Sequence, residues 1–308
     1  MTASQTPLRY ECLDVFAPHA YRGSSLPVFT NASNLDGEQM LAVAQELRQF
    51  ETIFLVPSSA KNRFRARIFD LLEELPFAGH PLLGAAAALH HIAAPPKATC
   101  QWTFELANRC VDVSTYRTGH GFAATVDQGA ASVVGECARR SELAAAFGLR
   151  ESDLDPALPL EVISTGLAYL IVPVRSDALG RARIDADITE LLTPLGANFA
   201  VLLDEEGREA RHWNNDGRLE DVATGSAAGT IGAYRLRHCG SKSGETFILN
   251  QGRFVGRPSR MEVVAHGAAD AIHSVQVGGP VSVVGWGMLE VLPQARMSSQ
   301  RKLNHAAS

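Results

Sequence analysis

Two short glycine-containing segments, one in each half of this 308-residue chain, read alike. The first is FAGHPLLG, Phe77 to Gly84, and the second is ATGSAAG, Ala223 to Gly229. Each places a glycine and a small polar or imidazole group where an alanine-rich helix should begin. The first N–H groups of a helix lack partners within it and carry partial positive charge, so each helix start can hold an anion. The two segments together predict a site for a small anionic metabolite between two similar lobes.

Composition narrows the class of protein. The hydrophobic fraction of 46% and the charged fraction of 20% are ordinary for a globular chain. A formal net charge of -5 argues against a nucleic-acid partner, because proteins that bind nucleic acids normally present a basic face. The longest apolar runs, such as Leu82 to Leu89, are too short to span a bilayer, so no membrane partner is expected.

The cysteines and the N-terminal segment bear on the compartment. The N-terminal residues have neither a basic region nor an apolar region typical of a signal peptide. Five scattered cysteines are an odd number without CxxC spacing, which favours reduced thiols and a cytoplasmic location. The ten histidines form no HExxH motif, so we expect no metal site.

The pattern of strands and helices predicts an α+β fold. Alternating and continuous apolar runs indicate many short strands, and an Ala-rich helix lies near the middle of each half. No βαβ rhythm of a doubly wound sheet is present. We therefore expect mostly antiparallel strands wrapped around one central helix in each lobe. The expected N-terminal lobe is 1–128 with a return strand at about 286–296, followed by a C-terminal lobe at 129–285 and a disordered tail at 297–308.

Several motifs, spread in order over nearly the whole chain, resemble those of the PhzF-like phenazine-biosynthesis family, which shares the diaminopimelate-epimerase fold. The segments that carry the resemblance are Asp14-Val15-Phe16 with Arg22-Gly23, Glu74 to Pro81, Ser164 to Leu167, Asp221 to Gly229, Gln251-Gly252 with Gly256 to Ser259, and Gly278-Gly279.

The resemblance implies two pseudo-symmetric lobes, each a β-roll around a central helix, with the site between them. It implies an isomerase that shifts a proton within a small cyclic carboxylate without a metal or organic cofactor, as the best-known member does on a dihydro-hydroxyanthranilate ring. It also implies a homodimer. The family's site residues fall on Glu51, His80, Asp221 and Ser226.

Glu51 is the expected general base and acid. It stands between Phe50 and the apolar run Ile53 to Leu55, and a carboxyl group desolvated by apolar neighbours holds its proton to higher pH. One such group can take a proton from one carbon and return it to another on the same face. The alternative interpretation is a solvated glutamate at the start of a strand.

The remaining candidates surround the two helix starts. His80 is expected to hydrogen-bond a substrate carboxylate or relay a proton, and Asp221 to orient a substrate amine or hydroxyl or to pair with His80. The alternatives are a packing histidine and a turn aspartate. Substrate-binding roles are expected for four small residues whose N–H groups or side chains face the ligand: Gly79, Gly225, Ser226 and Ala227.

Two other functions stay open, and the chain departs from the usual family pattern at three places. An epimerase or racemase of the same fold would use a thiol at each helix start, but the chain has His80 and Ser226 there. A metabolite-binding protein with a non-catalytic cleft would not need Glu51. The chain also departs from the usual family pattern, with Ser24-Ser25 in place of Asn-Pro, Val222 in place of proline, and Phe50 in place of serine.

Overall fold

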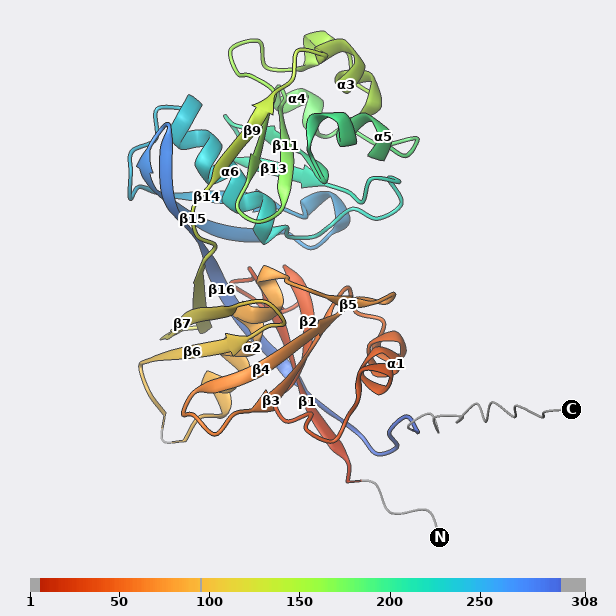
Figure 1. Cartoon of the computed structure of the whole chain (residues 1–308), viewed down its shortest axis with the longest axis vertical. Coiled ribbons are helices and arrows are strands. Elements are labelled where there is room, and N and C mark those ends of the chain that lie inside the picture. The colour runs from red at the N-terminus through yellow and green to blue at the C-terminus, as the bar shows by residue number, and fades with distance from the viewer. Residues whose placement is uncertain (1–5, 95, 295–308) are drawn as a thin grey trace, which may run out of the picture.

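A computed structural model describes residues 6–94 and 96–294 (Figure 1). Its strands form one sixteen-stranded sheet that winds through both halves of the molecule. The strands are β1 Leu8–Val15, β2 Ser24–Phe29, β3 Thr52–Pro57, β4 Arg63–Phe69, β5 Glu74–Leu75, β6 Thr99–Glu105, β7 Cys110–Thr118, β8 Gly121–Asp127, β9 Ser132–Glu136, β10 Glu161–Ser164, β11 Ala168–Pro173, β12 Phe199–Asp204, β13 Glu209–His212, β14 Thr246–Gln251, β15 Ser259–Ala268 and β16 Ala271–Leu289.

Helices are fewer than strands in the described residues. They are α1 Gly37–Leu47, α2 Gly79–Ile92, α3 Arg140–Ala146, α4 Ser176–Leu179, α5 Thr189–Leu192 and α6 Gly225–His238, with 3₁₀ turns at Glu151–Asp153, Thr193–Leu195 and Arg253–Val255. In the described part of the chain, no helix has the length and apolarity that a membrane crossing requires.

Eight strands of the N-terminal half close into a barrel. The order is β1-β2-β3-β4-β6-β7-β8-β16, and β16 closes the ring by pairing with β1 as well as β8. Helix α2 packs inside, against strands on several sides (Figure 1). A helix that is apolar all round must be buried, and Ala85 to Ala88 are fully buried. We expected a roll here, and the shared strand β16 makes it a closed barrel.

The C-terminal half repeats much of this pairing but stays open. Its strands run β16-β15-β14-β13-β12-β11-β10-β9 around α6, and β9 is the free edge. From β1 to β8 the successive pairings are antiparallel, parallel, antiparallel, parallel, antiparallel and antiparallel. The pairings from β10 to β16 follow the same series. The sheet is therefore mostly antiparallel, as predicted.

One long strand, β16, joins the two halves. Its first part pairs with β15, and its last part, 281–289, pairs with β1. Within this continuous strand the chain pairs with β8 of the N-terminal half from 276 and with β1 from 281 to 289, so the expected return strand at about 286–296 overlaps only its end. The predicted tail at 297–308 lies outside the described residues. The boundary between the two lobes, expected between 128 and 129, stays a prediction. One hydrophobic cluster contains buried residues of both halves, so the core does not mark this boundary.

Phe16 lies where the two halves meet. Its φ of 61° is in the left-handed region that non-glycine residues seldom adopt. Its carbonyl accepts from the Arg260 N–H at 2.9 Å, and the next residue, Ala17, donates its N–H to Pro280 O at 2.9 Å. The Phe16 ring is fully buried and lies against the backbone of Gly225 and Gly279. The strained conformation is thus held by contacts with the C-terminal half.

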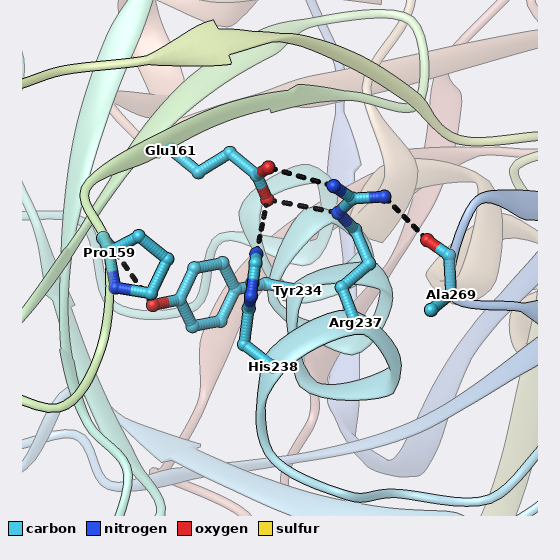
Figure 2. Close-up of polar contacts among 6 residues, drawn as sticks. All are labelled: Pro159, Glu161, Tyr234, Arg237, His238 and Ala269. Carbon is cyan, nitrogen blue, oxygen red and sulfur yellow. Dashed lines mark hydrogen bonds and ion pairs between the residues drawn. The ribbon is translucent and has the colours of Figure 1, made fainter.

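The last turn of α6 is anchored to β10 and the preceding segment (Figure 2). The carboxylate of Glu161, 1% exposed, accepts two hydrogen bonds from Arg237 at 3.1 Å and lies 2.8 Å from Nε2 of His238. Tyr234 donates its hydroxyl proton to Pro159 O at 2.7 Å. Basic groups at a helix C-terminus interact favourably with the helix dipole. These contacts fix the end of α6 that lies far from Gly225.

An ion pair between a buried carboxylate and a half-buried arginine joins the two halves near Phe16. Arg257 donates from Nη2 to Oδ1 of Asp14 and from Nε to Gly23 O, both at 2.7 Å. Asp14 is 2% exposed, and burial raises the pKa of its carboxyl group while Arg257 opposes the rise. Removing the arginine would leave a buried carboxylate without its cationic partner.

We therefore expect Arg257→Met to lower the free energy of unfolding by roughly 2 kcal/mol, between the scales for a buried and an exposed pair, because the Arg257 side chain is 32% exposed. The matched control is Arg218→Met, because Arg218 pairs with Asp216 at 3.6 Å with its side chain 87% exposed. That variant should change stability by less than about 0.5 kcal/mol. Urea denaturation of the three proteins measures both values, and equal losses would show that the pair with Asp14 contributes no more stability than an exposed pair.

Candidate active site

The starts of α2 and α6 are built alike. Gly79 and Gly225 are the first helical residues, and the capping residues Ala78 and Thr224 make no side-chain cap hydrogen bond. Neither first turn contains an acidic residue. The positive ends of both helices therefore lack a negative group of their own at these positions, which is the arrangement that favours binding of an anion.

The lack of a side chain has a different consequence at each of the two helix-start glycines. A Cβ atom on Gly79 would meet no atom within 4 Å, so there is open space in front of this residue. A Cβ on Gly225 would lie 3.3 Å from Cζ of Phe16. Gly225 therefore allows the Phe16 ring to pack against α6, whereas Gly79 leaves room that the protein itself does not fill.

Glu51 precedes β3 and is buried, with 7% of its surface exposed. Its Oε2 lies 3.3 Å from Nε2 of His80 but has no hydrogen-bond partner among the described residues. Burial raises the pKa of Glu51 well above its ordinary value, and the carboxylates of Asp221 and Asp70 add to the rise. The predicted desolvated carboxyl is thus present, and the solvated alternative is wrong for this residue.

His80, in the first turn of α2, is 6% exposed. Its Nε2 lies 3.2 Å from Oγ of Ser24 and 3.3 Å from Glu51. Burial lowers the pKa of His80 to about 4, although the negative charge of Asp221 opposes this shift. The imidazole is therefore neutral near neutral pH. A neutral imidazole beside a carboxyl that holds its proton can pass one proton between the two groups.

Asp221 shapes the turn that leads into α6. Its Oδ2 accepts from the Thr224 hydroxyl at 2.6 Å, and its Oδ1 accepts from the Ala223 N–H at 3.2 Å. The residue is 8% exposed and is close enough to influence Glu51 and His80 through its charge. The side-chain partners found for Asp221 among the described residues do not include His80. Asp221 thus shapes this turn, and a direct pair with His80, one of its two expected roles, is not among these contacts.

Ser226 joins the cluster through a tyrosine that sequence analysis did not single out. Its Oγ lies 2.7 Å from Oη of Tyr169, a residue of β11 that is 2% exposed. Burial raises the pKa of Tyr169, and the carboxylates of Asp221 and Glu51 raise it further. Ser226 itself is half-buried, whereas the adjacent Ala227 is 1% exposed and packs in the core.

Two buried amides hold the start of α6 in place. Gln251 accepts the Thr224 N–H at 3.2 Å and donates to Asp221 O at 2.9 Å. Gln128, just after β8, donates to Gly225 O at 2.9 Å and accepts from the Thr165 hydroxyl at 2.8 Å. These side chains fix the direction in which the first N–H groups of α6 point.

The structure thus brings Glu51, His80 and Asp221 into one electrostatic cluster, and Tyr169 extends it to Ser226. Sequence reasoning missed Tyr169 and Ser24. Tyr169 follows the matched Ser164 to Leu167 segment, but its apolar neighbours make it resemble a core residue. Ser24 stands at one of the departures from the family pattern, which was the available signal. No group of three or more potential metal ligands occurs in 6–94 and 96–294.

The chain is similar in sequence to a family of known proteins. A family model described as phenazine biosynthesis-like protein (PhzC-PhzF) matches residues 13–286. The chain is 32% identical over 282 residues to a protein of Pseudomonas aeruginosa named trans-2,3-dihydro-3-hydroxyanthranilate isomerase, covering 88% of this chain and 95% of that one. It is 28% identical over 295 residues to an uncharacterized isomerase of Salmonella typhimurium, with 88% and 95% covered.

Solved structures share the fold. A predicted epimerase from Pseudomonas aeruginosa is 49% identical with a TM-score of 0.84, over 92% of this chain and 99% of that one. A PhzF-family protein from Bacillus anthracis is 22% identical with a TM-score of 0.81 over the same shares. A hydroxyproline epimerase from Agrobacterium vitis, 13% identical with a TM-score of 0.61 over 92% of each chain, shares the fold alone.

The raised pKa of Glu51 predicts how stability depends on pH. Below its ordinary pKa of 4.5, Glu51 is protonated in both the folded and the unfolded chain. As the pH rises, the unfolded chain loses this proton first, so the favourable contribution of the folded state declines until the raised pKa is passed. Glu51→Gln removes this titration. The unfolding free energy of the parent, minus that of the variant, should therefore fall from pH 4.5 upward.

Urea denaturation at intervals between pH 4 and pH 8 measures this difference. A difference that stays constant over the whole interval would mean that the Glu51 carboxyl titrates alike in the folded and unfolded chains.

Proposed function

The chain belongs to the phenazine biosynthesis-like family, and we propose that it is a cofactor-independent isomerase that shifts a proton on a small, cyclic, carboxylate-bearing metabolite. The observation that supports this most is the state of Glu51. Its carboxyl is buried, holds its proton to unusually high pH, has an oxygen without a hydrogen-bond partner among the described residues, and lies 3.3 Å from the His80 imidazole.

Glu51 acts as both base and acid in this proposal. The ionised form of this carboxyl can take a proton from one carbon, and its raised pKa strengthens it as a base before it returns the proton to another carbon. The electron pair of the broken C–H bond moves through the conjugated substrate to the carbon that receives the proton. No electrons are gained or lost, and the enzyme ends in its starting protonation state. His80 can hydrogen-bond the carboxyl or relay its proton.

The two helix starts bind the substrate carboxylate. The N–H groups of Gly79, Gly225 and Ala227, together with the hydroxyl of Ser226, are donors of the kind that hold anions at helix N-termini. Gly79 and Ser226 are half-buried, so the ligand meets them first. Asp221 then orients a substrate amine or hydroxyl. Glu51 and His80, 7% and 6% exposed, lie deeper.

The recurring series of strand pairings supports two pseudo-symmetric lobes, 1–128 and 129–285, with the substrate in a cleft between them. The family resemblance supports a homodimer, and the odd set of free thiols supports a cytoplasmic location. The relative named trans-2,3-dihydro-3-hydroxyanthranilate isomerase makes that compound the first substrate to test.

Stereochemical inversion is the second candidate, favoured by the 49% identical structure described as a predicted epimerase. Inversion needs proton-transferring groups on both faces of one carbon. The thiol pair of known two-base enzymes is absent here, because the helix starts carry His80 and Ser226. An epimerase would therefore have to pair Glu51 with another acid or base.

Glu51→Gln tests the assignment directly. The amide keeps the shape of the side chain but cannot exchange a proton with carbon, so turnover should fall by at least about a hundredfold. We would incubate trans-2,3-dihydro-3-hydroxyanthranilate, and a panel of small cyclic and α-amino carboxylic acids, with the protein in deuterated water. NMR then locates any deuterium. Label at a second carbon indicates isomerisation, whereas label at a stereocentre with inversion indicates epimerisation.

Glu11→Gln is the matched control, because Glu11 is also buried, with 4% exposed, but pairs with Arg9 on β1 away from the cluster. This variant should keep the parent's activity. A Glu51→Gln protein that labels substrate as fast as the parent would exclude Glu51 as the base, and a parent that binds these acids without labelling any would favour a metabolite-binding protein.

Gly79→Ala separates ligand binding from folding. The added methyl group enters open space, so stability should be unchanged or rise by up to about 1 kcal/mol. The same methyl occupies the space in front of the helix start and should weaken substrate affinity at least about tenfold. Thermal melting and calorimetric titration measure the two effects, and unchanged affinity would place the carboxylate elsewhere.

A further inference from the structure

We propose that Tyr169 is a positioning residue: it donates its phenolic hydrogen to Oγ of Ser226, so that the Ser226 hydroxyl hydrogen points at the substrate carboxylate. This inference rests on the proposed function, in which Ser226 contacts the carboxylate. Tyr169 then makes the site prefer a carboxylate to a neutral ligand of the same shape, although Tyr169 itself does not touch the substrate.

The geometry of the pair is well defined. Oη of Tyr169 lies 2.7 Å from Oγ of Ser226, and this is the hydrogen-bond partner found for the phenol among the described residues. Tyr169 is 2% exposed, so water does not compete for the phenol. A buried hydroxyl is costly unless it is paired, and here the pairing partner is the serine at the start of α6.

Neighbouring strands hold the tyrosine ring. Tyr169 on β11 pairs in register with Phe199 on β12, and their ring centroids are 5.7 Å apart. The ring of His212, on β13, meets Tyr169 edge to face at 5.6 Å. Nδ1 of His212 lies 2.9 Å from Ala200 O, and since a carbonyl only accepts, that nitrogen carries the hydrogen. Burial lowers the pKa of His212, so the ring that packs against Tyr169 is neutral.

The direction of the Tyr169–Ser226 hydrogen bond follows from acidity and charge. A phenol is a stronger hydrogen-bond donor than an alcohol, so the tyrosine hydrogen goes to Ser226. Burial raises the pKa of Tyr169, so the phenol keeps this hydrogen throughout the working pH range. The Ser226 hydrogen is then free to point away from Tyr169. The opposite direction would turn serine lone pairs toward an anion, which is unfavourable.

Loss of the Tyr169 hydroxyl is expected to weaken the binding of a charged ligand more than that of a neutral one. Without the phenol, the Ser226 hydroxyl loses its fixed orientation and can rotate. A carboxylate requires a donor at this position, whereas a carboxamide can use its own N–H groups to meet either orientation. Tyr169→Phe should therefore weaken carboxylate binding about tenfold, the scale of one hydrogen bond to a charged group, and change carboxamide binding much less.

Tyr234→Phe provides a matched control. It removes the hydroxyl of another buried tyrosine, whose hydrogen bond goes to Pro159 at the opposite end of α6 (Figure 2). Each variant keeps its aromatic ring, so packing is preserved in both. A purely structural effect of losing one buried hydrogen bond should appear in the two proteins alike.

The experiment uses the full-length chain with Glu51→Gln as background, so that binding is measured without turnover. Calorimetric titration gives the Kd of trans-2,3-dihydro-3-hydroxyanthranilate and of its carboxamide for this background, and after adding Tyr169→Phe or Tyr234→Phe. We expect a tenfold loss confined to the carboxylate and to Tyr169→Phe. Ser226→Ala should reproduce that loss, and adding Tyr169→Phe to it should have no further effect, since the tyrosine acts through the serine.

Equal losses for the two ligands, or equal losses in the two tyrosine variants, would overturn the role of Tyr169 while leaving the proposed function intact. Failure of both ligands to bind the background protein would instead overturn the proposed function and this inference with it. Should Tyr169→Phe not fold, Ser226→Ala alone decides, because a loss that is the same for carboxylate and carboxamide contradicts the proposed donor direction.

Discussion

The buried carboxyl of Glu51 is the constraint on which the rest of the site depends. An ionised carboxylate in an apolar environment is costly unless cations or hydrogen bonds compensate it, and Oε2 of Glu51 has no hydrogen-bond partner among the described residues. Its pKa therefore rises, and the nearby carboxylate of Asp221 raises it further. The same burial keeps His80 neutral. Burial thus favours the neutral forms of two groups that would form an ion pair in water.

The architecture supplies this environment by placing one helix inside each half and aiming both helix starts at the same region. The closed barrel around α2 leaves His80 in its first turn facing the start of β3, where Glu51 lies. The open half holds α6 from both ends: Glu161 binds its last turn, whereas Gln128 and Gln251 fix its first. Strand β16 pairs with strands of both halves and so fixes the position of α2 relative to α6. The strained backbone of Phe16 sits at the same junction.

Sequence patterns were sufficient for the α+β class and for both helix starts, because each depends on local features, whereas the four polar positions were assigned through the family resemblance. A glycine before an alanine-rich run marks a helix start wherever that helix packs. Closure of the first half into a barrel could not be read from the chain, since it depends on β1 pairing with residues some 270 positions away. Ser24 and Tyr169 were missed for a related reason. Each lies in a strand whose neighbours are buried, and only the packing of separate strands shows which polar side chains meet.

The sequence by itself determined where the chemistry-bearing groups stand along the chain and which helices could present N–H groups to an anion. Those properties follow from residue type and short-range spacing. Only the tertiary structure decided that Glu51 is desolvated, that His80 is neutral beside it, and that Asp221 acts on both through its charge while its side chain bonds to Thr224. A pKa depends on every dipole and charge within several ångströms and on the exclusion of water. Both are set by residues that are distant in sequence and become neighbours only when the chain folds.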